Sequence, residues 1–135
     1  MDYEKMRKHW DRATSYERTF LAMHPFLVKD IEENARKATD ETVRRFGRNG
    51  YNDSSDAFRH CYFSALLTRD IGLSNARFFM DAHELFEGNP EEEFRMDMHN
   101  NHIGFRLGIF GGDDLTLADR CYAALQQNKL KVISP

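Results

Sequence analysis

Three short polar clusters lie inside segments that otherwise have the apolar spacing of amphipathic helices. They are Asp56-Ala57-Phe58-Arg59-His60, Ala82-His83-Glu84 and Met96-Asp97-Met98-His99-Asn100-Asn101. In each cluster at least one titratable residue falls on the stripe that should face the core. A polar group there is costly unless it is paired, hydrogen-bonded or bound to a metal. Three such exceptions between residues 56 and 101 predict one shared polar site between helices.

The clusters contain the residue types of a catalytic metal centre. His60, His83 and Asp97 form a candidate set of two imidazoles and one carboxylate. These ligands suit zinc, manganese or iron in a site that keeps open positions for water. The ion would lower the pKa of a bound water, and Glu84 or Glu87 would be the general base. The sequence therefore predicts a divalent metal, zinc or manganese, with His60, His83, Glu84 and Asp97 as catalytic residues.

Two other interpretations of the same residues stay open. In a metal-free enzyme, His60 or His83, oriented by Asp97, would activate water or a substrate hydroxyl, while arginines hold an anionic group. In a non-enzymatic binding module, the cluster would instead be a buried network that stabilises the helices. The candidate substrate-binding residues are Arg59, Asn101 and Arg106.

The elements that must position these residues are helices almost throughout. Apolar residues at helical spacing predict a first helix over residues 3–21 and a second from Pro25 to a C-cap at Gly47. A third helix, capped by Ser54 or Ser55, should run to Gly72. The remaining expectations are a fourth helix capped by Ser74, a fifth opened by Pro90 that fades through Gly104, Gly108 and Gly111-Gly112, a sixth capped by Asp113 or Asp114, and a short extended piece over residues 130–133.

Length and composition predict an all-α fold with five to six helices in one domain over residues 1–135. The 135 residues are 41% hydrophobic and include 11 phenylalanines, which is enough for one core. The net charge of −3 gives no nucleic-acid signal, and no apolar run is long enough for a transmembrane segment. Charged residues throughout 1–22 argue against a signal peptide. We therefore expect a cytoplasmic protein as synthesised, with Cys61 and Cys121 as buried, reduced thiols.

The ordered motifs resemble a family. Asn52-Asp53-x-x-Asp56-Ala57-Phe58-Arg59-His60, then Asp81-Ala82-His83-Glu84, then Met96-Asp97-x-x-Asn100-Asn101-x-x-Gly104 are similar to a small domain of unknown function. That domain occurs at the C-termini of bacterial RHS-repeat and other polymorphic-toxin-like proteins. The likeness covers about residues 24–108. It implies a toxin or effector, usually a hydrolase, with an immunity protein as partner and export by a system that needs no cleavable signal.

A looser similarity is to metal-dependent HD-type phosphohydrolases, which are all-helical. Their order of one histidine, a His-Asp pair and a later aspartate is similar to His60, His83-Glu84 and Asp97 here. Glu84 replaces the aspartate of the pair, and the gap to Asp97 is short. The substrate classes that these resemblances leave open are phosphoesters and peptidoglycan.

Overall fold

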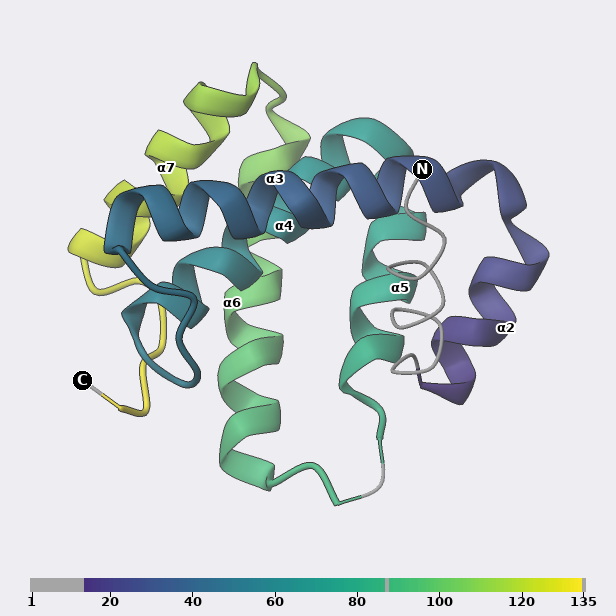
Figure 1. The fold of residues 1–135 in the computed structure, drawn as a ribbon, viewed down its shortest axis with the longest axis horizontal. Coiled ribbons are helices and arrows are strands. Elements are labelled where there is room, and N and C mark those ends of the chain that lie inside the picture. The colour runs from purple at the N-terminus through teal and green to yellow at the C-terminus, as the bar shows by residue number, and fades with distance from the viewer. Residues whose placement is uncertain (1–13, 87, 135) are drawn as a thin grey trace.

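One helix, α4, lies at the centre of the structure and touches most of the others. The computed structural model describes residues 14–86 and 88–134. Figure 1 shows α3 crossing the molecule in front of α4, while α5 and α6 extend from the same end and are joined by the 85–90 loop. The elements are α2 Ser15–Met23, a 3-10 turn Pro25–Leu27, α3 Val28–Phe46, α4 Ser54–Ile71, α5 Leu73–Glu84, α6 Glu91–Ile109 and α7 Asp114–Gln126. The expected all-α single domain is confirmed, and the described residues contain no strand.

The sequence of α4 explains its central place. Alanines and other apolar residues occupy nearly every position between Ala57 and Leu67, so the helix is apolar on more than one face. A helix that is hydrophobic around most of its circumference must be buried. One side of α4 packs with α3, α6 and α7 around Phe58, and the other packs with α2 and α5 around Phe79.

Two glycines allow α6 to lie unusually close to α4. A Cβ atom at Gly104 would lie 2.7 Å from the Ser64 Cβ and closer still to the Cys61 carbonyl oxygen. A Cβ at Gly108 would lie 2.5 Å from the Ala65 carbonyl oxygen. The expectation that the fifth helix fades at these glycines is wrong, because α6 continues to Ile109. The close packing outweighs the low helix propensity of glycine.

The helix ends confirm some expected caps and correct others. Gly47 ends α3 in the left-handed region at φ 69°, as expected, and Asp113 caps α7. The cap of α4 is Asp53 rather than Ser54 or Ser55, because its carboxylate accepts from the Asp56 backbone N–H. Ser74 does not cap α5, which begins at Leu73 after Gly72.

The two ends of the chain differ from expectation in different ways. Most of the expected helix over residues 3–21 lies outside the described residues, which show α2 at Ser15–Met23. Residues 130–133 run alongside the site without forming a strand, and the backbone N–H groups of Ile133 and Ser134 donate to the Asn52 carbonyl oxygen. Among the described residues no helix has the length and apolar character that a membrane span requires.

Candidate metal centre

The loop before α4 fixes the first acidic residue of the site. Asn52 has a left-handed backbone, φ 60°, which asparagine tolerates better than most residues. This conformation lets the Asn52 backbone N–H donate to Asp56 Oδ2 at 2.8 Å, while its side-chain amide donates to Glu93 on α6. Asp56 is 1% exposed and also pairs with Arg59. One Asp56 oxygen is therefore held by the loop, and the other faces the helices.

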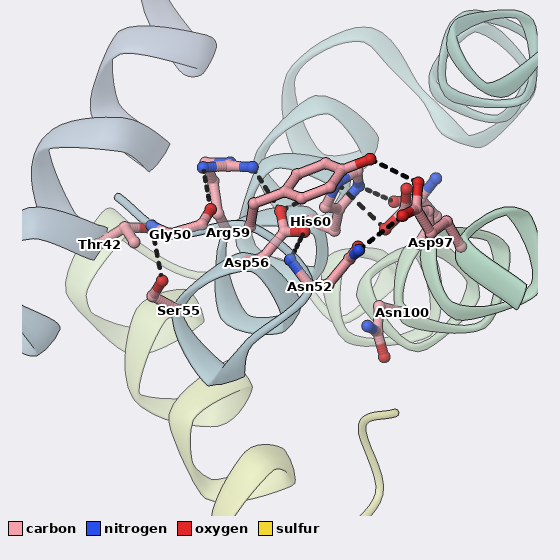
Figure 2. A network of polar contacts seen from close by, with 12 residues as sticks. Thr42, Gly50, Asn52, Ser55, Asp56, Arg59, His60, Asp97 and Asn100 are labelled. Carbon is pink, nitrogen blue, oxygen red and sulfur yellow. Dashed lines mark hydrogen bonds and ion pairs between the residues drawn. The ribbon is translucent and has the colours of Figure 1, made fainter. Parts of the chain in front are cut away.

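Three side chains converge between α4 and α6, as Figure 2 shows for Asp56, His60 and Asp97. His60 Nε2 lies 3.4 Å from Asp56 Oδ1 and 3.4 Å from Asp97 Oδ1. The three potential ligand atoms all lie within 4.8 Å of one another. Two ligands about 2.1 Å from a tetrahedral ion lie about 3.4 Å apart, so these separations suit a metal. This buried group could bind a divalent cation.

The other nitrogen of His60 is held by an amide. His60 Nδ1 lies 3.1 Å from Asn101 Oδ1, which also accepts from the Ser64 hydroxyl at 3.3 Å. With the Asn101 amide in this orientation its oxygen accepts, so Nδ1 carries the hydrogen. In neutral His60 the lone pair is then on Nε2, directed at the two aspartates. Such a hydrogen bond from the second nitrogen is typical of metal-bound histidines.

Two carboxyl oxygens at the site accept no hydrogen bond among the described residues. They are Asp97 Oδ1 and Glu84 Oε1, and Glu84 is 2% exposed. Burial raises the pKa of Glu84 to about 8; the charge of His60 opposes this, and the Asp97 carboxylate adds to it. Burial also raises the pKa of Asp97. The raised pKa values of these two neighbouring carboxyls favour a proton shared between them.

For Asp56 and His60, charged neighbours outweigh the effect of burial on the pKa. Burial alone would raise the pKa of Asp56, but the hydrogen bond and charge of His60, with the charge of Arg59, lower it. Burial would lower the pKa of His60, yet Asp56, Asp97 and Glu84 raise it. Without a metal, a proton on Nε2 balances the carboxylates. The position between Nε2 and the aspartates thus requires either a proton or a metal ion.

His83, which the sequence includes in the predicted ligand set, lies at the edge of the site. Its side chain is 52% exposed, and its Nδ1 lies 3.1 Å from Glu17 Oε2 on α2. Burial opposes but does not outweigh this contact, which raises the pKa of His83. The group that has metal-site geometry contains Asp56 and not His83. His83 instead lines a cavity of about 160 Å³ together with His60 and Arg59.

The other candidates are distributed around this centre. Glu84 Oε1 lies 3.9 Å from His60 Nδ1, and Asn101 is fully buried against His60. Arg59 pairs with Asp56. Arg106 is exposed near the end of α6, nine residues beyond Asp97, which is about 13 Å along a helix. Glu87 lies outside the described residues.

Sequence reasoning missed several residues that build the site. The i, i+4 spacing places Asp56 on one face of α4 with His60, yet the predicted ligand set does not include Asp56. Asn52, Ser64 and Glu93 are not among the predicted site residues, because they act through a loop conformation and contacts between helices. Glu17 was also missed, although its burial and its bond to His83 fix the position of that ring.

The two cysteines are not among the candidate ligands. Cys61 and Cys121 are free and buried, with 3.1 Å between their sulfur atoms.

No solved structure matches the chain. A family model described as a domain of unknown function (DUF6973) matches residues 18–129, which include Asp56, His60 and Asp97. The match supports the expected uncharacterised domain, whereas the RHS-repeat context stays a prediction. The chain belongs to this DUF6973 family.

Proposed function

We propose that this domain is a metal-dependent hydrolase whose ion binds Asp56, His60 and Asp97. The observation that carries the proposal is the position of His60 Nε2, 3.4 Å from two carboxylate oxygens, with Nδ1 held by Asn101. One imidazole and two carboxylates suit zinc or manganese and leave coordination positions for water. The sequence suggests His83 as a further ligand of the ion. A His83 substitution tests this variant of the proposal.

The bound ion would supply a water of lowered pKa and a Lewis acid for the substrate oxygen. Glu84 is the residue proposed to move the proton. Its Oε1 is buried, accepts no hydrogen bond among the described residues and lies 3.9 Å from His60 Nδ1. A carboxyl with a pKa near 8 can hold or release a proton close to neutral pH, which general acid–base catalysis requires.

The remaining side chains of the site would position these groups. Asn101 would hold the imidazole of His60, and Asn52 would hold the Asp56 carboxylate. Arg59 lies beside the aspartates and is proposed to contact an anionic part of the substrate. Arg106 is the more remote substrate-binding candidate from the sequence. A toxin or effector role extends the proposal and rests only on the motif resemblance.

A specific observation also favours the competing function, a binding module with a structural network. Asp56, Asn52 and Glu93 connect the loop before α4 to α6, and Asn100 holds residue 131 of the C-terminal segment. Such a network would stabilise a docking domain without chemistry. Removing a partner would then destabilise the fold and leave no metal-dependent property to lose.

The experiment that tests the hydrolase is a phosphoester assay on metal-loaded protein. Wild type loaded with zinc or manganese should cleave a chromogenic phosphoester, and His60→Ala and Glu84→Gln should lower kcat by about a hundredfold or more. Arg36→Gln is the matched control, because Arg36 is an exposed residue of α3 that pairs, among the described residues, only with Asp40. Equal turnover in wild type and His60→Ala would contradict the proposal.

A further inference from the structure

A cavity beside the metal centre is assigned no role by the proposed chemistry. It lies between α3, α4 and α5 and has a volume of about 160 Å³. Its apolar wall contains Phe63, Met80 and two alanines of α3, and its polar lining consists of Thr39, Arg59, His60 and His83. An apolar protein cavity of roughly 150 Å³ can hold a benzene molecule. The cavity therefore has room for one ring-sized group.

The ionisable groups on the two sides of His60 differ in sign. No described residue that lines the cavity is a carboxylate, and its ionisable groups are one arginine and two histidines. The acidic residues Asp56, Asp97 and Glu84 contact His60 but do not line the cavity. The cavity side of His60 thus offers donors, whereas the α6 side offers acceptors.

Some of the N–H groups that line the cavity are available to donate to a ligand. Among the described residues Arg59 donates to Asp56, Asn49 and the Gly50 carbonyl oxygen, which uses three of the five N–H groups of a guanidinium. His83 contacts Glu17 through Nδ1, and its half-exposed ring lines the cavity. Arginine and imidazole donors at one edge of an apolar cavity suit an anion that carries an apolar group.

We propose that this cavity binds a small organic anion, with its charged oxygens against Arg59 and His83 and a ring-sized apolar group against Phe63 and Met80. The inference names the substrate class of the proposed hydrolase and rests on that proposal for the anion's role as substrate. Binding itself requires no metal, so the two proposals can fail separately.

The test is calorimetric titration of the chain in EDTA with phenyl phosphate, benzoate and neutral benzyl alcohol. Phenyl phosphate or benzoate should bind at least tenfold more tightly than benzyl alcohol, because only the anions receive charge-assisted hydrogen bonds. Whichever anion binds more tightly identifies the head group as phosphate or carboxylate. Equal binding of all three ligands, or no binding, would overturn the inference.

Two variants locate the binding. His83→Ala should weaken anion binding about tenfold, since it removes one donor to a charged group. Ala35→Leu places added side-chain volume on the α3 wall and should abolish binding, whereas Ala22→Leu on the exposed part of α2 should not. Unchanged affinity in Ala35→Leu would mean that the anion binds elsewhere and would overturn the inference.

A parallel zinc titration of the same samples without EDTA separates the two proposals. Zinc binding without anion binding would refute the cavity proposal and leave the metal centre standing. Anion binding without zinc binding would support the cavity as a binding site and refute the metal-dependent function.

Discussion

Replacing Glu84 with glutamine should remove a large part of the pH dependence of stability. Glu84 is 2% exposed, and burial is the main reason that its pKa rises from 4.5 to about 8. The folded protein therefore keeps a proton on Glu84 that the unfolded chain has released. The contribution of Glu84 is fully present below pH 4.5 and is lost as the pH rises through 8.

The magnitude follows from the width of this window. Each pH unit between the two pKa values changes the unfolding free energy by about 1.4 kcal/mol, which gives at most about 5 kcal/mol across the window. Glutamine has nearly the same size and can donate to Asp97 as protonated Glu84 does. Glu84→Gln should thus match wild type near pH 5 and exceed its stability by several kcal/mol at pH 8.

The assay is urea unfolding followed by far-ultraviolet circular dichroism at pH 5, 6, 7 and 8 in EDTA. Comparison with wild type cancels the contributions of groups that the substitution leaves unchanged, such as Glu17 and His83. Glu91→Gln is the control, because that carboxylate is 76% exposed and its one ion pair within the described part of the chain is with Arg95. Parallel curves for wild type and Glu84→Gln across this range would refute the reasoning.

Three further predictions test single parts of the structure. Asn101→Ala should lower metal affinity by about tenfold or more in a zinc titration, because it frees the ring of His60; the neighbouring Asn100→Ala should only reduce stability, and equal zinc affinities would contradict this. Gly104→Ala should destabilise the fold by about 3 kcal/mol in urea unfolding, because its Cβ overlaps α4; wild-type stability would show that α6 can move away. Asp53→Ala and Asp113→Ala should each lower the free energy of unfolding by about 1 kcal/mol, because each removes a helix cap. Only Asp53→Ala should also weaken zinc binding. Equal zinc affinity in both variants would show that the α4 cap does not support the site.

The helices could largely be predicted from the sequence, because apolar spacing, Gly47 and Asp113 are local signals. The caps at Asp53 and Gly72 were harder, since several neighbouring residues have the same capping chemistry. The sequence of α6 predicts that the helix ends near Gly104 and Gly108. In the structure these glycines instead let α4 pack closely against α6, and that contact cannot be read from the sequence of α6 alone.

The sequence predicts where the candidate site lies in the fold better than it predicts which residues form it. Polar residues on core-facing stripes identified His60, Asp97, Asn101 and Glu84, which all lie around one centre. The choice between His83 and Asp56 depends on the rotation of α5 and on its contact with α2. Glu17 holds His83 toward α2, and a pairing between residues so distant along the chain has no local signature.

Metal content measured by plasma mass spectrometry tests the central claim most directly. Untagged wild type, His60→Ala, Asp97→Asn and His83→Ala would each be loaded with zinc or manganese and then desalted. We predict near-stoichiometric metal in wild type and His83→Ala, and loss of metal in the other two variants. Loss in His83→Ala would instead make His83 a ligand, and wild type that retains no metal would contradict the metal centre itself.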